Sequence, residues 1–362
     1  MKTNILIVGA GPYGLSLANY LAHQKKDFLI AGKSMELWRE HTFDNMDLRS
    51  DVATSTIIHP ENKFSFENYC LSNNQSIEEL KGMLPVTTFR RYLNWCESSY
   101  DFDVIPEYVV KIEKNDHGFT SRLKSGAEIV SNKVVMATGV AHHLNIPEDL
   151  LNSKSSIKEK SKTKNLKVIH SYDTAEIAHQ KNKKVLVIGA GQSAAESIDI
   201  LLQNKNKVDW HSRTRPIYFK EPLNIPKWLF NIIVYSAGVV RAIPPAISKR
   251  ILSIFSATTI TPNFQPMMEK IQRLKHLPDL SNYDIIVTAT GYRYDIRYMD
   301  FIGDTILKNL KLRKQMPYVN PDFETSIPGL HFIGPIIEQY FGPAMKFMIG
   351  AHYAAPKLSS KL

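Results

Sequence analysis

The sequence predicts an α/β fold made of two Rossmann-like dinucleotide-binding domains, with the second inserted into the first. A short motif appears as IVGAGPYG near the start of the chain and again, 180 residues later, as VIGAGQSA. Each copy follows an apolar run and precedes a helix-compatible stretch, which is the strand, glycine turn and helix that open a nucleotide-binding unit. Two segments that contain Ala-Thr-Gly flank the second copy, and we interpret them as the points where the chain leaves the first unit and re-enters it.

The first copy runs from Asn4 to Leu21 and predicts a buried parallel strand followed by a helix. Its first glycine permits the turn, its second lets the backbone approach a pyrophosphate, and its third sets how closely the helix packs on the strand. The N-terminus of the helix then faces the phosphates. The cofactor-binding residues expected in this loop are Gly9, Gly11, Pro12, Tyr13 and Gly14.

The next strand ends in FLIAGKSMELW, at the place where an FAD domain usually has an acid that binds the adenosine ribose. Here Gly32 and Lys33 occupy that place, and Glu36 lies too far along the chain to be a good replacement. We still expect FAD in this unit, with Lys33 as an atypical ribose contact. Trp38 is a candidate for core packing or for packing on the flavin, and the sequence does not separate the two.

Residues 101–139 predict a β-meander, with turns at Asp116–Gly118 and Ser125–Gly126. The meander would carry the adenine-side contact of the cofactor, around Val109 and Val110. It closes with VVMATGV, the first of the two Ala-Thr-Gly segments. The cofactor-binding candidates of this stretch are Val110, Thr138 and Gly139.

The second copy, from Lys184 to Leu201, has an alanine in the third glycine place, a substitution associated with NADP-type sites. Its second strand gives KVDWHSRTR, with no acid at the end. This favours NADPH, because an arginine there accepts the 2′-phosphate. Gln192 lies in the turn, toward the pyrophosphate and the nicotinamide, and is a candidate catalytic residue. The expected cofactor-binding residues are Gly189, Gly191, Gln192, Ser193, Ala194, Ser212 and Arg213.

The C-terminal part of the chain is expected to return to the flavin domain. IIVTATGYRYD (Ile285 to Asp295) pairs a β-rich run with Ala-Thr-Gly, and Leu330 to Ile333 predicts a further strand. A helix is predicted to begin near Gly342, because proline is favoured just inside a helix start. Its positive end would face the flavin pyrimidine. The candidates here are Thr290, Gly291, Tyr292, Gly334, Gly342 and Pro343.

Three segments follow from this organisation. Residues 1–150 are expected to form the first part of the FAD-binding domain, and residues 283–362 its second part. Residues 151–282 form the inserted NADP-binding domain. Within it, residues 228–262 are an apolar segment that we place on the substrate side.

Charge and composition exclude several classes of protein. The chain has 362 residues and a net charge of +10, much of it in Lys154–Lys167 and Lys181–Lys184. These stretches lack aromatic residues and are typical of solvated connectors, so we expect no nucleic-acid partner. The apolar stretch Trp228–Val240 falls short of the ~20 residues needed to cross a bilayer. Because the chain begins directly with a strand and Cys70 and Cys96 form no CxxC, we expect a cytoplasmic protein without a metal site. Whether it forms a homo-oligomer stays open.

These motifs resemble those of the FAD- and NADPH-dependent monooxygenases with two dinucleotide-binding domains. That group includes flavin-containing monooxygenases, Baeyer–Villiger enzymes, and lysine or ornithine N-hydroxylases. GAGQSAAE (Gly189 to Glu196) is most similar to the N-hydroxylating branch, and Ala289 to Tyr292 resembles the second marker of the family. The family's FxGxxxHxxx fingerprint is reduced here to His170. The resemblance implies that FAD, NADPH and O₂ oxygenate a small-molecule substrate through a flavin hydroperoxide.

The resemblance also implies a catalytic role for Arg49, which falls where the family approaches the reacting face of the flavin. Arg90 and Arg91 are alternative anion contacts, and His170 either shifts the NADP domain or caps a strand. Tyr340 is a core or flavin-packing residue. Two other functions stay open: an NADPH-dependent flavin reductase that passes electrons to a quinone or a protein, and a flavin-binding regulatory protein without turnover.

Overall fold

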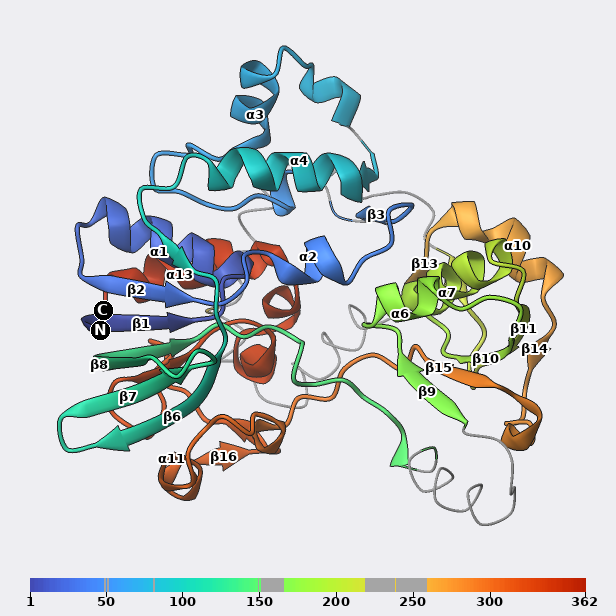
Figure 1. Cartoon of the computed structure of the whole chain (residues 1–362). Helices are drawn as coiled ribbons and strands as arrows, with labels where there is room; N and C mark the ends of the chain where they lie inside the picture. Colours follow the sequence, from blue (N-terminus) through green and yellow to red (C-terminus); the bar gives the residue numbers. More distant parts are fainter. Residues whose placement is uncertain are drawn as a thin grey trace.

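Two β-sheets, each with its own helices, divide the molecule into two units that lie side by side (Figure 1). The computed structural model describes residues 1–48, 50, 52–80, 82–148, 150, 166–218, 238 and 259–362. Both chain termini belong to the first unit, and the middle of the chain forms the second. The predicted insertion of one Rossmann-like unit into another is confirmed.

The first sheet combines a parallel part with an antiparallel meander. Its parallel strands, in spatial order, are β5 (Val104–Ile105), β2 (Phe28–Ala31), β1 (Lys2–Val8), β8 (Glu128–Met136) and β18 (Leu330–Phe332). The meander adds β7 (Gly118–Leu123) and β6 (Val109–Asn115) beside the first half of β8. The structure therefore confirms the predicted meander and the predicted return strand near residue 330.

The second sheet is entirely parallel. Its spatial order is β14 (Arg273–Leu274), β11 (Lys207–His211), β10 (Lys184–Ile188), β15 (Ile285–Thr288) and β9 (Lys167–His170). The sequence placed the strand of Ile285–Asp295 in the first unit, and that assignment is wrong, because β15 lies between β10 and β9. A short apolar run fits the centre of either parallel sheet, since both faces of such a strand are buried. The second unit consequently extends past residue 282, at least to Thr288.

Helices flank both sheets (Figure 1). The first unit has α1 (Pro12–His23), α2 (Glu36–Glu40), α3 (Phe66–Ser72), α4 (Val86–Glu97), α11 (Asp304–Asn309), α12 (Glu338–Phe341) and α13 (Ala351–Ser359). The second unit has α6 (Thr174–Ala178), α7 (Gln192–Gln203) and α10 (Gln265–Lys270). α1 and α7 begin directly after the two glycine loops, as predicted, and α1 packs against α13.

Small elements complete the described chain. Three two-stranded sheets pair β3 (Asp47–Leu48) with β4 (Leu84–Pro85), β12 (Ile217–Tyr218) with β13 (Thr259–Ile260), and β16 (Leu312–Arg313) with β17 (Met316–Pro317). Single 3₁₀ turns lie at Val52–Thr54, Ile77–Leu80, Pro262–Phe264, Leu280–Asn282, Ile296–Tyr298, Pro335–Ile337, Pro343–Lys346 and Met348–Gly350. None of the described helices is long and apolar enough to cross a membrane.

The helix predicted near Gly342 is shorter than expected. It is a single 3₁₀ turn, Pro343–Lys346, and the chain then becomes extended at Phe347, with φ −117° and ψ 166°. The Tyr13 hydroxyl lies 2.9 Å and 3.0 Å from the carbonyl oxygens of Met345 and Phe347. These acceptors would serve the backbone ladder of a continuous helix. The contact with Tyr13 therefore replaces part of the helix that the proline signal predicts.

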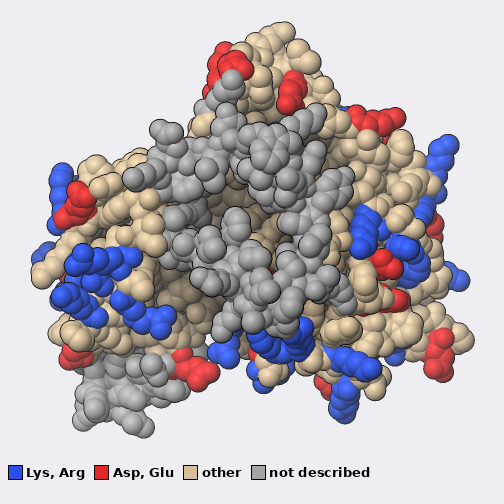
Figure 2. Space-filling model, turned by 180° about the vertical axis from the view of Figure 1, so that it is seen from behind, with Lys and Arg blue, Asp and Glu red and all other residues tan. Residues whose placement is uncertain are grey.

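Charged side chains are mixed on the face shown in Figure 2, where Lys and Arg form several separate groups with Asp and Glu among them. Lys181–Lys184 is exposed, and only Lys181–Lys183 form a connector, because Lys184 is the first residue of β10. The greater part of Lys154–Lys167, and of the apolar segment 228–262, lies outside the described residues. Cys70 and Cys96 are buried as free thiols.

Candidate active site

The first glycine loop packs against its own unit everywhere except at its middle glycine. Gly9 has φ +110°, and a Cβ there would lie 2.5 Å from the carbonyl oxygen of Ala137. A Cβ on Gly14 would lie 1.9 Å from the carbonyl oxygen of Gly9. A Cβ on Gly11 would meet no atom of the described chain within 4 Å. The outer glycines thus allow the turn to pack, whereas the middle one faces open space.

That open space lies at the N-terminus of α1. Gly11 is the extended N-cap residue, Pro12 is the first helical residue, and the backbone bond from Leu15 N–H to Gly11 O measures 2.9 Å. The amides of the first helical turn have no partner within the helix, and the helix dipole favours an anion in front of them. The loop consequently fits the pyrophosphate of a dinucleotide.

Tyr13 joins this loop to the C-terminal segment. A Cβ on Gly350 would lie 1.9 Å from the tyrosine hydroxyl oxygen, and a Cβ on Gly334 would lie 3.6 Å from its ring. Gly334 and Gly342 both have positive φ, at +92° and +89°. The side chain of Tyr13 therefore supports the fold of the segment that begins at Gly334, and a direct contact of Tyr13 with a cofactor remains a prediction.

The second glycine loop repeats the close packing of the first glycine and the extended N-cap of the helix. Gly189 has φ +154°, and a Cβ there would lie 2.3 Å from the carbonyl oxygen of Ala289. Gly191 is the extended N-cap residue of α7, and Ser193 is exposed on its first turn. Ala194 is fully buried in the core of the second unit. The small third residue thus lets α7 pack on the sheet.

Gln192 uses both ends of its side-chain amide within the second unit. Its Oε1 accepts a hydrogen bond from the backbone N–H of Thr261 at 2.8 Å. Its Nε2 donates to Thr261 Oγ1 at 3.1 Å and to Glu196 Oε1 at 2.9 Å. Gln192 therefore ties the chain after β13 to the start of α7. Sequence reasoning missed Thr261, because nothing local links residues so far apart.

The end of β11 carries the residues expected to choose between NADPH and NADH. Ser212 is buried, and its hydroxyl donates to the carbonyl oxygen of Thr214 at 2.8 Å. Arg213 is exposed. Arg273, from β14, donates to the Ser212 carbonyl oxygen at 2.6 Å. Two guanidinium groups therefore lie near the end of this strand, which suits a phosphate group on the ribose.

The two segments that connect the units, residues 140–145 and 289–293, run side by side. Leu144 and Tyr292 form an antiparallel bridge. The N–H of Asn145 donates to Gly291 O at 3.0 Å, and the hydroxyl of Thr290 donates to the Asn145 carbonyl. The two connecting segments therefore hold one another where the chain passes between the units.

Each Ala-Thr-Gly segment lies against one glycine loop, since Ala137 faces Gly9 and Ala289 faces Gly189. The glycine that ends each segment has positive φ, +65° at Gly139 and +73° at Gly291. A Cβ on either glycine would meet no described atom within 4 Å. The turns that end both segments are thus open among the described residues, and Thr138 precedes the first of them.

His170, the last residue of β9, is hydrogen-bonded to the second connecting segment. Its Nδ1 accepts a hydrogen bond from the N–H of Tyr172 at 3.1 Å, so Nε2 carries the proton and donates to Gly291 O at 3.1 Å. Burial lowers the pKa of His170. This geometry matches the strand-capping alternative, and domain movement by His170 remains untested.

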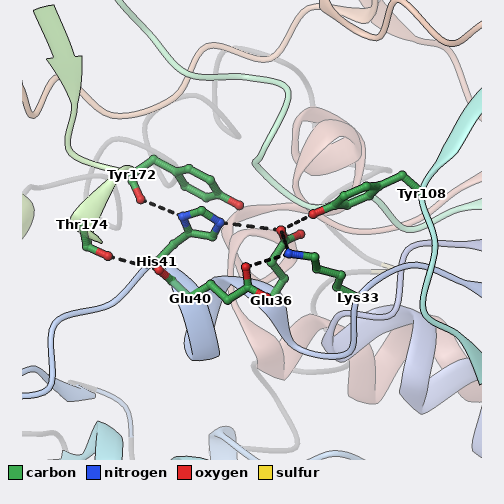
Figure 3. Close-up of polar contacts among 7 residues, drawn as sticks. All are labelled: Lys33, Glu36, Glu40, His41, Tyr108, Tyr172 and Thr174. Atoms are coloured by element: carbon green, nitrogen blue, oxygen red, sulfur yellow. Dashed lines mark hydrogen bonds and ion pairs between the residues drawn. The ribbon is translucent and has the colours of Figure 1, made fainter. Parts of the chain in front are cut away.

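Lys33 is held by carboxylates of α2 (Figure 3). Its Nζ lies 2.7 Å from Glu40 Oε2 and 3.6 Å from Glu36 Oε1. Glu36 also accepts a hydrogen bond from the hydroxyl of Tyr108. Since Tyr108 adjoins the meander strand that contains the exposed Val110, the ribose-side and adenine-side candidates lie near one another.

The remaining candidates have varied surroundings. Trp38 packs edge-on against Phe89, with ring centroids 5.3 Å apart, which supports a role in the core. Tyr340 is buried, and its ring lies 5.7 Å from that of Tyr318. Arg91 is exposed and donates to Thr88 on its own helix. The predicted catalytic residue Arg49 lies outside the described residues.

Comparison with known proteins finds similarity to monooxygenases. The family model described as L-lysine 6-monooxygenase/L-ornithine 5-monooxygenase matches residues 2–225. The probable indole-3-pyruvate monooxygenase YUCCA9 of Arabidopsis thaliana is 27% identical over 215 residues, which are 56% of this chain and 45% of that protein. The chain thus aligns with less than half the length of the plant relative.

Two solved structures share the fold over the whole chain. The ornithine hydroxylase PvdA from Pseudomonas aeruginosa has a TM-score of 0.76 and 16% identity, covering 100% of this chain and 98% of that one. The ornithine N-hydroxylase KtzI from Kutzneria sp. 744, with reduced FAD, NADP⁺ and L-ornithine, has a TM-score of 0.75 and 15% identity, covering 100% and 99%. Both structures share the fold of this chain, and the second of them contains a flavin and a nicotinamide nucleotide.

Proposed function

The chain belongs to the L-lysine 6-monooxygenase/L-ornithine 5-monooxygenase family, and on that premise we propose that it hydroxylates the nitrogen of a primary amine. The balanced reaction is R–NH₂ + NADPH + H⁺ + O₂ → R–NHOH + NADP⁺ + H₂O. One observation carries the proposal: the family match, residues 2–225, includes both glycine loops. The substrate class is the side-chain amine of lysine, ornithine or a related diamine.

In this proposal each glycine loop binds one cofactor, so that FAD lies in the first unit and NADPH in the second. Bound FAD would supply the redox chemistry, which is the transfer of two electrons from NADPH to O₂. The open space at Gly11, in front of α1, would receive the FAD pyrophosphate. The start of α7 and the exposed Arg213 would receive the second dinucleotide. The chain's own task is to bind both groups and to orient them toward the connecting segments.

The two proposed catalytic residues act differently in this scheme. Gln192 shapes the NADPH side, because its amide holds Thr261 and Glu196 in place. Arg49 keeps the role that the family resemblance implies, beside the reacting face of the flavin. The other two functions that the sequence left open, a reductase and a regulatory protein without turnover, gain no support from the family match.

The experiment is an assay of the FAD-loaded protein with NADPH, O₂ and a panel of amines. L-Lysine, L-ornithine and 1,5-diaminopentane are compared with the same molecules acylated on the terminal nitrogen. We expect one hydroxylamine per NADPH with at least one free amine, seen by mass spectrometry as the gain of one oxygen. If every amine gives hydrogen peroxide alone, or the acylated molecules are oxygenated as readily as the free amines, amine hydroxylation is wrong.

A further inference from the structure

A short piece of the first unit is built into the core of the second. We call residues 40–45, which run from the last residue of α2 onward, the docking segment. Its Phe43 is only 6% exposed and belongs to a buried apolar cluster whose other buried members, among the described residues, lie between residues 169 and 287. In Figure 1 the blue chain after α2 reaches across to the second unit beside α6 and α7.

Polar contacts flank Phe43 on both sides. The ring of His41 stacks on that of Tyr172, with centroids 3.8 Å apart, and His41 Nδ1 lies 2.9 Å from the Tyr172 carbonyl oxygen (Figure 3). Thr174 donates to the carbonyl oxygen of Glu40 at 3.3 Å. Beyond Phe43, Asn45 Nδ2 donates to Asp199 Oδ2 on α7 at 2.8 Å. The docking segment thus contacts the second unit along its whole length.

Arg90, on α4 of the first unit, fixes the conformation of the docking segment through hydrogen bonds from its guanidinium group. Its Nε donates to the carbonyl oxygen of Trp38 at 2.8 Å. Its Nη2 donates to the carbonyl and hydroxyl oxygens of Thr42 at 2.9 Å and 3.0 Å, and its Nη1 donates to Asp44 Oδ1 at 2.5 Å. These contacts occupy the residues on either side of Phe43. The guanidinium that the sequence offered as an anion contact is therefore engaged with the protein itself.

The position of the docking segment matters because, in the proposed function, each nucleotide binds to a different unit. A hydride moves efficiently only when donor and acceptor atoms are about 3–3.5 Å apart, and a displacement of about 1 Å costs on the order of a hundredfold in rate. The connecting segments hold the units together through residues 140–145 and 289–293. The docking segment is a separate contact, made through α6 and α7. A second contact at another place constrains the relative orientation of the two units more than the connecting segments do alone.

We propose that Arg90 is a positioning residue for hydride transfer, acting through Phe43 on the orientation of the two units. The proposal rests on the proposed function, because it requires NADPH and FAD to react in this protein. In that step the hydride leaves C4 of NADPH with its electron pair and bonds to N5 of the flavin. NADPH + FAD + H⁺ then gives NADP⁺ + FADH₂.

The first test is anaerobic stopped-flow reduction of the FAD-loaded protein at saturating NADPH. Arg90→Ala and Phe43→Leu should each lower the limiting rate by about tenfold to a hundredfold. The combined variant should be little slower than either, because both changes release the same contact. Arg90→Lys, which keeps the charge but loses the forked geometry, should recover part of the rate. Reduction by dithionite and the FAD content should not change.

A matched control is Arg122→Ala, which removes another arginine paired with a carboxylate, Glu128, on the surface of the first unit. It should reduce its flavin at the wild-type rate. Multiplicative losses in the combined variant, or an unchanged rate in Arg90→Ala, would overturn the proposal. A loss of FAD or of dithionite reduction in Arg90→Ala would also overturn it, since the residue would then serve folding alone.

The second test does not depend on activity. Hydrogen exchange followed by mass spectrometry, on protein without and with FAD, should show faster exchange in Arg90→Ala for peptides covering residues 38–46, α6 and α7. Peptides from β1 and β10 should keep the wild-type rate. Unchanged exchange at α6 and α7 would refute docking by Arg90. If NADPH fails to reduce the wild-type flavin, the proposed function falls with the hydride-transfer role, whereas hydrogen exchange still decides whether Arg90 docks the units.

Discussion

Gly11 and Gly14 lie in one loop but have different neighbours. Substitutions at the two positions should therefore distinguish an effect on FAD binding from an effect on folding. In Gly11→Val the new side chain enters open space at φ −85°, which any residue adopts, so we expect a folded protein without FAD. In Gly14→Ala the methyl carbon would lie 1.9 Å from the Gly9 carbonyl oxygen, so stability should fall by about 1–3 kcal/mol or more. FAD content and the melting temperature of the apo-protein measure the two effects. Wild-type FAD content in Gly11→Val would show that no pyrophosphate lies there.

Arg213 and Ser212 are adjacent, but substitutions at the two positions should affect the KM for NADPH differently. Arg213→Ala should raise the KM for NADPH about tenfold to a hundredfold, since a charge-assisted contact with a phosphate contributes about 1.5–3 kcal/mol. The KM for NADH should stay nearly constant. Ser212→Ala should change either KM little, because its hydroxyl donates to the Thr214 carbonyl oxygen. Steady-state assays with both donors measure this, and an equal loss for NADPH and NADH would rule out Arg213 as the phosphate ligand.

At the scale of elements, Gln192 joins α7 to the segment after β13. Gln192→Ala leaves the backbone N–H of the fully buried Thr261 without its acceptor, which costs about 1–3 kcal/mol. We expect a lower melting temperature and faster hydrogen exchange in residues 259–264, with or without NADP⁺. Gln203→Ala, at the exposed end of the same helix, is the control and should match the wild type. If Gln192→Ala keeps full stability but loses activity, its role is in catalysis alone.

The first connecting segment should make the protein sensitive to acid. Burial lowers the pKa of His143, which is 1% exposed, to about 4, against about 6.5 in an unfolded chain. The unfolded state therefore binds a proton first as the pH falls. The contribution of His143 to stability is complete above pH ~6.5 and declines toward pH ~4, by about 1.4 kcal/mol for each pH unit.

His143→Phe removes the pH-dependent contribution of His143 to stability. The variant keeps an aromatic ring beside Tyr294, whose ring centroid lies 5.2 Å from that of His143. Urea unfolding midpoints at pH 7 and pH 5 should differ less in the variant than in the wild type. A residual slope is expected, because burial also lowers the pKa of His352 to about 4. Parallel pH profiles for the two proteins would contradict the assignment to His143.

At the scale of the whole molecule, the features that could be predicted from the sequence are those that depend on residues close together in the chain. The turns at Gly9 and Gly189 need positive φ and close backbone approach, which the motif itself encodes. Which sheet contains Ile285–Thr288 depends on pairing with distant strands, and the apolar run looks alike in either place. The sequence around Phe43 does not reveal that its side chain is buried in the second unit. A single aromatic residue between polar residues can also lie on a protein surface.

The nested arrangement predicts how electrons leave the molecule. Each nucleotide loop lies against one of the two Ala-Thr-Gly segments through which the chain passes between the units, so NADPH should reduce the flavin of its own molecule and O₂ should accept the electrons next. Without O₂, each FAD-loaded molecule should oxidise one NADPH and stop, even when a quinone is added. With O₂ and a productive amine, NADPH and O₂ should be consumed one to one, with little hydrogen peroxide. Gly11→Val, which lacks FAD, should consume no NADPH. Sustained oxidation of NADPH by a quinone in the absence of O₂ would instead identify a reductase.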